Sequence, residues 1–380
     1  MFYVDIPQAD LDDLKARLGR IRWPSEVEGA GWDYGTNLDY LKSFTEYWQT
    51  RYNWREQEAR LNRFAHFRAE IDGFGLHFVH ERGKGPNPLP LLLTHGWPDS
   101  FYRFYKLIPL LTDPAKYGGD PADSFDVIVP SMPGYGFSDR PTKSGIGGQR
   151  IAELFVRLMT ETLGYEKFAA HGGDIGSGVT EWLAYQHATS LVGIHLTDLP
   201  YEYLFTMPQE DLSEDERKYL EQGQAWQRQE GAYDLLQGTK PQTLAYGLND
   251  SPVGLAAWIV EKFRAWSDCD GEVETRFSKD ELLTNITLYW LTGTIGTSFF
   301  PYFEGQHSSA KDASQYTDVP TGVAIFPKDI VPAPKEFGEH FFNIQRWTEM
   351  PRGGHFAALE EPELLAEDLR AFFQKYRATS

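Results

Sequence analysis

The stretch His171-Gly-Gly-Asp-Ile-Gly-Ser177 decides how this chain is expected to fold. The apolar segment Phe168-Ala-Ala170 leads into it, and apolar residues at helical spacing follow it, at Val179, Trp182, Leu183 and Tyr185. This pattern predicts a short strand, an abrupt turn and a helix. Such a turn forces its apex residue into a strained backbone conformation, which small neighbouring residues make sterically possible. We therefore expect Asp174 to stand at the carboxyl end of a strand, over the N-terminus of a helix.

The identity of the apex residue indicates the chemistry. In many enzymes with this turn the apex is a serine within the pattern G-x-S-x-G, whereas the apex of Gly172-x-Asp174-x-Gly176 is an aspartate. A carboxylate with an unperturbed pKa of about 3.9 is ionised at neutral pH and can attack an sp³ carbon without a base. The expected substrates are therefore alkyl electrophiles, such as epoxides or haloalkanes. A serine esterase built on Ser177 is disfavoured, because Ser177 lies beyond the apex on the helix.

Strand and helix patterns alternate on both sides of this turn. Helical spacing predicts helices at 101–111, 146–163 and 362–376. Apolar runs predict strands at 64–71, 76–81, 89–94, 125–130, 168–172, 191–199, 319–327 and 342–348. Asp72-Gly-Phe-Gly75 predicts a hairpin turn between the first two of them. This alternation predicts an α/β fold with a doubly wound, mostly parallel sheet.

Two segments do not follow that alternation. Residues 1–63 carry three helical patterns but too little apolar content to fold alone, so we expect an N-terminal arm that wraps against the main body. Residues 201–303 contain charged helical stretches and no strong strand, which predicts a helical cap inserted between two parts of the core, 64–200 and 304–380. The polar stretch 305–316 is expected to be a loop.

Composition restricts the partners. The 380 residues include 36 Lys+Arg and 55 Asp+Glu, and the resulting net charge of -19 disfavours nucleic acid or an anionic membrane surface. The single cysteine, Cys269, excludes an internal disulfide and a multi-thiolate metal site. No apolar run approaches the roughly 18 to 20 residues that span a bilayer, and the N-terminus lacks the features of a signal peptide. We expect a soluble, cytoplasmic protein and leave a homodimer open.

If Asp174 is a nucleophile, its partners should follow in the order nucleophile, acid, histidine. His355 is the expected base, because it lies in a glycine-containing loop between the last strand pattern and the last helix. Asp329, two residues after Phe326-Pro327, is placed to orient that imidazole. Asp198, at the end of the strand predicted at 191–199, is the competing candidate for the acid.

The turn His95-Gly-Trp-Pro98 after a predicted strand supplies a further element. We expect the backbone N–H of Trp97 and that of Ile175 to form an oxyanion hole. Attack by Asp174 would give an alkyl-enzyme ester, which water activated by His355 would hydrolyse. An epoxide oxygen needs a proton donor as it leaves, and a tyrosine phenol of the cap could supply the proton. Composition and spacing do not choose among the cap tyrosines.

Eight motifs, in order along nearly the whole chain, together resemble the microsomal-type epoxide hydrolase family. They are Trp23-Pro-Ser-Glu26, His95-Gly-Trp-Pro98, Pro133-Gly-Tyr-Gly-Phe-Ser138, Gly172-Gly-Asp-Ile-Gly-Ser177, Thr239-Lys-Pro241, Leu248-Asn-Asp-Ser-Pro-Val-Gly-Leu-Ala-Ala257, Leu288-Tyr-Trp-Leu-Thr-Gly-Thr294 and Arg352-Gly-Gly-His-Phe-Ala-Ala358. The resemblance implies an α/β-hydrolase fold and the opening of a small-molecule epoxide by water to a vicinal diol, with no cofactor and no metal. Soluble bacterial relatives in enediyne antibiotic pathways make natural-product biosynthesis one role to consider beside detoxification.

The resemblance also implies residue roles. Asp174 is the nucleophile, Asp329 the acid and His355 the base, and two ring-opening phenols are implied. These are Tyr233, eight residues before the proline of Thr239-Lys-Pro241, and Tyr302. Ile175 departs from the pattern, because many relatives have a tryptophan there that haloalkane dehalogenases use to bind halide. This departure weakens a dehalogenase as the alternative reading; a non-catalytic receptor on the same fold is the other.

Overall fold

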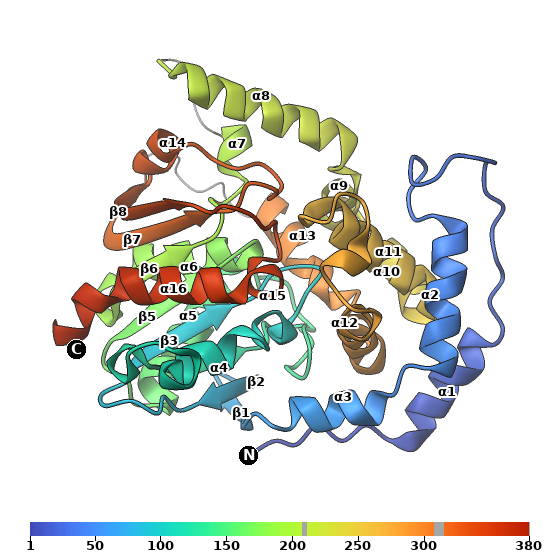
Figure 1. Cartoon of the computed structure of the whole chain (residues 1–380), viewed down its shortest axis with the longest axis horizontal. Coiled ribbons are helices and arrows are strands. Elements are labelled where there is room, and N and C mark those ends of the chain that lie inside the picture. Colours follow the sequence, from blue (N-terminus) through green and yellow to red (C-terminus); the bar gives the residue numbers. More distant parts are fainter. Residues whose placement is uncertain (207–210, 308–314, 380) are drawn as a thin grey trace.

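A computed structural model describes residues 1–206, 211–307 and 315–379, and its centre is one eight-stranded sheet (Figure 1). The strand order is β1-β2-β4-β3-β5-β6-β7-β8, in which β1 and β2, and β2 and β4, pair antiparallel and the other neighbours are parallel. The predicted doubly wound, mostly parallel sheet is confirmed. The strands are β1 His66–Ile71, β2 Phe74–Glu81, β3 Leu89–Thr94, β4 Phe125–Pro130, β5 Phe168–Gly172, β6 Leu191–Leu196, β7 Thr317–Ile325 and β8 Phe342–Glu349.

Helices cover both faces of the sheet. On one face α5 (Gly148–Arg157) packs on α6 (Ile175–Gln186), which contacts β3, β5 and β6. On the other, α4 (Leu107–Thr112) packs on α16 (Pro362–Phe373), which contacts β6 and β7. Each face has its own buried apolar cluster. The central strands are consequently buried on both sides.

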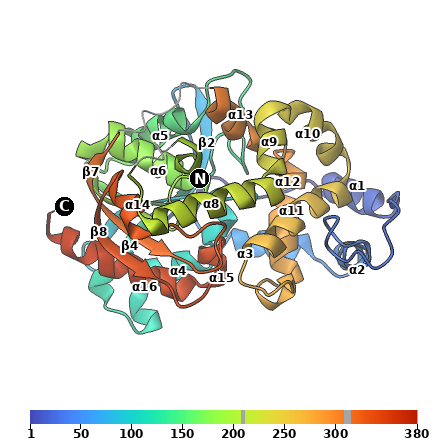
Figure 2. The ribbon, with the colours of Figure 1, turned by 90° about the horizontal axis from the view of Figure 1, so that it is seen from above.

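Between β6 and β7 the chain forms only helices within the described residues, and we call these seven the cap helices (Figure 1). Two of them begin with a capping box, in which Ser213 and Glu216, or Ser278 and Glu281, satisfy each other's backbone N–H groups. Figure 2 shows α8 extending over the sheet towards α9. The cap helices are α7 Tyr203–Thr206, α8 Glu214–Gln229, α9 Ala232–Thr239, α10 Pro241–Asp250, α11 Pro252–Trp266, α12 Lys279–Thr292 and α13 Phe300–His307.

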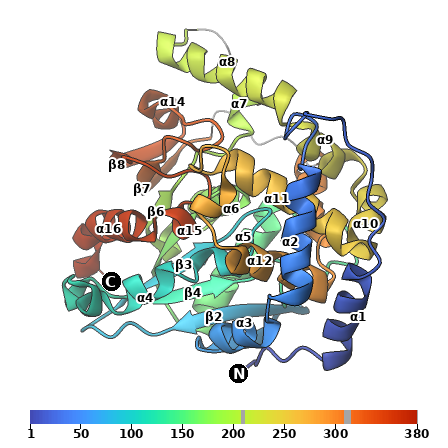
Figure 3. The same cartoon turned by 45° about the vertical axis from the view of Figure 1, so that its right-hand side comes forward.

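The N-terminal arm contains α1 (Gln8–Leu18), α2 (Leu38–Thr50) and α3 (Trp54–Leu61). Figure 3 shows α2 lying across α11 and α12, and contacts between these helices agree with the view. Three side chains tie the arm to the cap helices: Arg17 pairs with Asp250 at 2.9 Å, Thr36 donates to the carbonyl of Ala257, and Tyr47 donates to Asp280. Phe2 N donates to the carbonyl of His66 on the sheet edge. These contacts hold the N-terminal segment against the cap helices and the sheet edge.

Several predicted elements differ from the structure in their extent. The helix predicted at 101–111 is a 3₁₀ turn at Phe101–Phe104 followed by α4, and the missing N–H of Pro109 removes a hydrogen bond that a continuous helix would need. The helix predicted at 146–163 ends as a π-helical turn, Leu158–Thr162. Short helices at α14 (Lys335–Glu339) and α15 (Ala357–Glu360) were not predicted.

The loop predicted at 305–316 begins within α13, and its residues 308–314 lie outside the described residues. The strand predicted at 191–199 ends at Leu196, and the helix predicted at 362–376 ends at Phe373. No helix in the part of the chain that the structure describes is long and apolar enough to cross a membrane.

Candidate active site

Asp174 lies at the predicted turn between β5 and α6. Its φ of 58° and ψ of -129° place it in a region that L-residues rarely adopt. The turn is so tight that a Cβ on Gly172 would lie 2.1 Å from the carbonyl oxygen of Gly176, and a Cβ on Gly176 would lie 2.2 Å from that of Thr94. Glycine at these two positions is therefore a steric requirement, as the sequence pattern predicts.

The two carboxylate oxygens of Asp174 have different neighbours. Oδ1 accepts a hydrogen bond of 2.7 Å from Trp97 N, and the N–H of Ile175 also donates to this carboxylate. A Cβ on Gly96 would lie 2.3 Å from Oδ1, so only glycine permits this approach. Burial alone would raise the pKa of Asp174, but His355 and these two N–H groups outweigh it and lower the pKa. Asp174 is therefore an ionised carboxylate at neutral pH.

His355 lies in the loop between β8 and α15 and is fully buried. Its Nδ1 is 2.7 Å from Asp329 Oδ1, and its Nε2 is 3.4 Å from Asp174 Oδ2. Burial would lower the pKa of His355, but the charges of Asp329 and Asp174 raise it to about 10. The imidazole is accordingly cationic while Asp174 carries its charge.

The two candidate acids differ in what they contact. Asp329 bonds His355, as expected for the preferred candidate. Asp198, which follows β6, instead accepts a hydrogen bond of 2.8 Å from the backbone N–H of Asp174. Burial and the neighbouring charge of Asp329 raise the pKa of Asp198 to about 7. Asp198 thus supports the strained turn, and the geometry makes Asp329 the partner of His355.

Asp198, Asp329 and His355 also form the one cluster of described residues whose ligand atoms lie close enough, within 4.8 Å of one another, to hold a metal ion. Their hydrogen bonds to each other and to the turn account for this arrangement by themselves. The expectation of a reaction without metal or cofactor stays a prediction.

Tyr233 on α9 and Tyr302 on α13 both lie against Trp97. The Tyr233 ring stacks on Trp97 at 5.2 Å between centroids, whereas Tyr302 meets Trp97 edge-on at 6.0 Å and Tyr233 at 6.0 Å. Burial and the charge of Asp174 raise the pKa of both phenols well above 10. Both therefore keep their protons at neutral pH, and the structure brings them together beside the turn that carries Trp97.

A buried ion pair that sequence reasoning missed lies beneath the site. Arg103 pairs with Asp99 and donates to the carbonyl of His355 at 2.7 Å, while Asp99 accepts from Gly96 N at 3.0 Å. The pair joins the turn that carries Trp97 to the loop that carries His355. Opposite charges four residues apart, directly after His95-Gly-Trp-Pro98, were the available signal.

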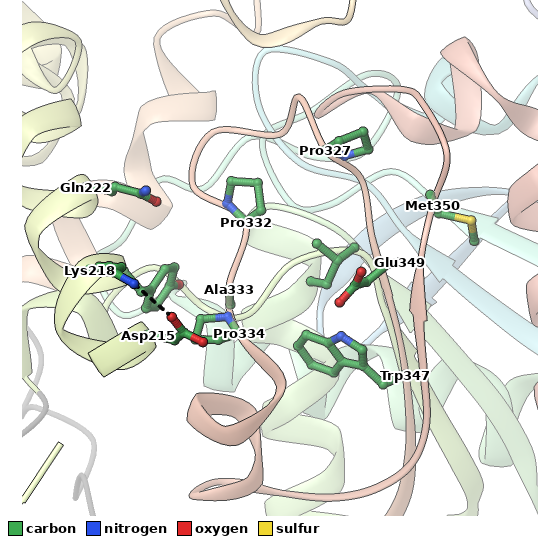
Figure 4. Close-up of a pocket in the computed structure, with 12 residues that line it drawn as sticks. Asp215, Lys218, Gln222, Pro327, Pro332, Ala333, Pro334, Trp347, Glu349 and Met350 are labelled. Carbon is green, nitrogen blue, oxygen red and sulfur yellow. Dashed lines mark hydrogen bonds and ion pairs between the residues drawn. The ribbon is translucent and has the colours of Figure 1, made fainter. Parts of the chain in front are cut away.

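A separate surface pocket of about 380 Å³ lies between α8 and the loop that follows β7 (Figure 4). Lys218, Pro332 and Trp347 are among the residues that line it. None of the predicted catalytic residues does, so this pocket is distinct from the site at Asp174.

The strained turn at Asp174, the hydrogen bond between His355 and Asp329 and the two N–H groups at Asp174 lie at the strand ends of an α/β-hydrolase fold. The N-terminal epoxide hydrolase family pattern matches residues 1–104, and the α/β-hydrolase fold pattern matches residues 90–242. A candidate epoxide hydrolase of Stigmatella aurantiaca is 48% identical over 99% of this chain and 85% of its own length. Epoxide hydrolase 1 of Sus scrofa is 39% identical over 98% of this chain and 87% of its own length.

Solved structures agree with these relatives. The epoxide hydrolase of Aspergillus niger superposes with a TM-score of 0.85 at 30% identity, over 99% of this chain and 96% of that one. The juvenile hormone epoxide hydrolase of Bombyx mori gives a TM-score of 0.85 at 30% identity, over 99% of this chain and 93% of that one. This chain belongs to the epoxide hydrolase family and is a hydrolase of that class.

Proposed function

We propose that this chain opens an epoxide to a vicinal diol through a covalent ester on Asp174. The observation that carries the proposal is the asymmetry of that carboxylate. Oδ1 is held by the Trp97 N–H, whereas Oδ2 faces His355 Nε2 at 3.4 Å. Oδ2 is thus the oxygen that attacks carbon, and Oδ1 becomes the carbonyl oxygen of the ester.

In the first step Asp174 Oδ2 attacks a ring carbon, and the bond from that carbon to the epoxide oxygen breaks. The oxygen takes a proton from Tyr233 or Tyr302, which lie beside Trp97 on the cap side. The products are an alkyl ester bearing a hydroxyl and a phenolate. Two phenols at one oxygen share the developing charge, which a single buried donor would have to carry alone.

In the second step His355 deprotonates a water that attacks the ester carbonyl, and the N–H groups of Trp97 and Ile175 stabilise the oxyanion on Oδ1. Esterification removes the negative charge 3.4 Å from His355 Nε2, so the pKa of His355 falls, and the imidazolium loses its proton to solvent and becomes a base only when the ester is present. When the intermediate collapses, the bond from the ester carbon to the alkyl oxygen breaks, and that oxygen takes the proton held by His355 to give the diol. The second proton of the water returns to the phenolate, and His355 regains its proton from solvent beside the restored Asp174 carboxylate.

A single turnover in ¹⁸O-labelled water tests this route. With enzyme in excess, the first diol should carry an unlabelled oxygen from Asp174, and the label should appear in the protein carboxylate. A diol labelled from water in that first turnover would rule out the ester.

A dehalogenase acting through the same Asp174 is the second candidate. The indole N–H groups of Trp97 and Trp266 are buried and have no acceptor among the described residues, and such donors could bind a halide. Ile175 argues against it, since no indole stands next to the nucleophile. Release of bromide from bromoalkanes, with no diol formed from any epoxide offered, would favour this candidate.

We further propose that residues 201–303 act as a lid on a core made of 64–200 and 304–380, with 1–63 as the arm, and that the protein works in the cytoplasm without nucleic acid or membrane partners. Limited proteolysis with and without a bound diol would locate the lid boundaries. Sedimentation velocity would decide whether the chain forms a homodimer.

A further inference from the structure

Glu360, the last residue of α15, makes an unusual set of hydrogen bonds around the loop that carries His355. Its Oε1 accepts from Phe356 N at 3.0 Å, and its Oε2 accepts from Gly354 N at 3.1 Å. These two N–H groups flank His355 in the chain. Oε2 also accepts from Asp268 N at 2.8 Å, two residues beyond the end of cap helix α11. One carboxylate thus binds three backbone N–H groups from two separate segments.

The same two segments are in direct backbone contact. His355 N donates to the carbonyl of Trp266 at 2.8 Å, and Gly353 N donates to Asp268 Oδ2 at 2.9 Å. A Cβ on Gly354 would lie 2.7 Å from the carbonyl oxygen of Trp266 and 2.9 Å from Asp268 N. The loop at 353–356 and the segment 266–268 therefore pack without space for an intervening side chain.

Trp266 connects this backbone contact to both the imidazole of His355 and the phenol ring of Tyr233. Its ring meets the His355 ring edge-on at 5.4 Å and the Tyr233 ring at 5.1 Å. The position of segment 266–268 consequently affects where the imidazole lies relative to the cap phenol. Charge-assisted bonds from a carboxylate to backbone N–H groups are among the stronger hydrogen bonds in proteins, and buried N–H groups lose stability when left without an acceptor.

We propose that Glu360 is a positioning residue for His355, which fixes the base loop to the end of cap helix α11 and so aligns the imidazole for ester hydrolysis. This inference rests on the proposed function, in which His355 acts only in the second step. Glu360 itself touches no reacting atom. Its loss should therefore slow hydrolysis of the alkyl-enzyme and leave its formation nearly unchanged.

The neighbouring Glu361 provides a matched control. Glu361 is buried, and its carboxylate accepts from the side chains of Arg276 and Arg352, at 3.0 and 2.8 Å. No hydrogen bond among the described residues joins that carboxylate to the backbone of 353–356. Both positions thus lose a hydrogen-bonded carboxylate on substitution, and only Glu360 accepts hydrogen bonds from the backbone on either side of His355.

The experiment compares Glu360→Gln with Glu361→Gln in the full chain, using styrene oxide as the probe. In Glu360→Gln an amide N–H group faces at least one backbone donor, so the loop loses alignment. We expect ester hydrolysis to slow by about 10-fold to 100-fold, as for a small misplacement of a catalytic group, with alkylation within about threefold of wild type. Rapid-quench intact mass measurement should then show accumulated alkyl-enzyme. Glu361→Gln should match wild type in both rates.

Equal slowing of both steps in Glu360→Gln, or no slowing, would overturn the positioning role, as would accumulation of ester in Glu361→Gln. If Glu360→Gln does not fold, Glu360→Asp keeps the charge on a shorter side chain and should slow hydrolysis selectively to a smaller extent; unselective slowing there would equally overturn the role. Failure of the proposed function is distinguishable, because wild type itself would then form neither alkyl-enzyme nor diol.

Discussion

The two sides of the candidate site are held in different ways. On the sheet side, Asp174, Asp329 and His355 are fixed by directional contacts, among them the 2.7 Å bonds that join Trp97 N to Asp174 and His355 Nδ1 to Asp329. On the cap side, Tyr233 and Tyr302 lie in a shell of aromatic rings at centroid distances of 5.1 to 6.0 Å. Directional bonds suit groups whose orientation decides a nucleophilic attack, and ring packing suits donors that must reach epoxides of different shape.

Removing the nucleophile from the sheet side should have the largest effect. Asp174→Ala should lower kcat by roughly 10⁴-fold to 10⁶-fold, since the proposed route has no other group that can form the ester. Diol formation from styrene oxide, with intact mass measurement for the ester, checks this. Ser177→Ala is the control and should retain activity within a few fold. Hydrolysis of an added nitrophenyl ester that persists in Asp174→Ala and is lost in Ser177→Ala would instead point to serine chemistry.

Substitution of either carboxylate near His355 should slow the reaction less than loss of Asp174 does. The two substitutions should still differ clearly from each other. Asp329→Asn removes the negative charge that orients the imidazole and stabilises its cation, and should cost about 10³-fold to 10⁴-fold in ester hydrolysis. Asp198→Asn keeps a carbonyl oxygen that can accept from Asp174 N, so we expect a loss of roughly tenfold or less. Single-turnover rates of both variants decide between them. A larger loss in Asp198→Asn would transfer the role of acid to Asp198.

On the cap side, each single substitution should slow alkylation less than the double substitution does. Tyr233→Phe and Tyr302→Phe should each slow alkylation by about 10-fold to 100-fold, because the second phenol still donates. Each keeps the ring and its packing, so ester hydrolysis should be unchanged. The double variant should lose most of the alkylation rate, as stopped-flow tryptophan fluorescence would show. Single variants that slow hydrolysis instead would remove the distinction between the two sides.

How far the sequence predicts this site also differs between the sides. Local pattern predicted that Asp174, Asp329 and His355 lie together on the sheet side and left Asp198 open as a second acid, since the glycines around Asp174 and the strand ends before Asp329 and His355 follow from steric and topological rules. The cap phenols came only from family resemblance, because a helix with several aromatic residues does not reveal which ring faces the site. Asp99, Arg103, Asp268 and Glu360 escaped prediction. Arg103, Asp268 and Glu360 each bond a backbone group far away in the sequence, which no local pattern encodes, whereas Asp99 pairs with the nearby Arg103.

The helix at 101–111 shows a related limit. The apolar spacing correctly indicated that this segment is largely buried. It does not reveal the hydrogen bond lost at Pro109, which divides the segment into two. Periodicity describes which residues are covered, whereas the exact ends of an element depend on capping and on tertiary contacts.

The smallest expected effect is on how the free energy of unfolding depends on pH. His355 on the sheet side should contribute to that dependence, and Tyr233 on the cap side should not. The pKa of His355 is raised to about 10 in the folded chain, against about 6.5 when unfolded. A raised histidine pKa stabilises the folded state fully below about pH 6.5, and this contribution is lost as pH rises towards 10. The free energy of unfolding of wild type minus that of His355→Gln should therefore fall between pH 6.5 and 9, by at most about 1.4 kcal/mol per pH unit. Urea denaturation at several pH values measures this difference.

The same difference for Tyr233→Phe should stay constant over that window, because the phenol keeps its proton throughout. A constant difference for His355→Gln would mean that the imidazole is neutral in the resting site, and the base would then need no ester to release its proton.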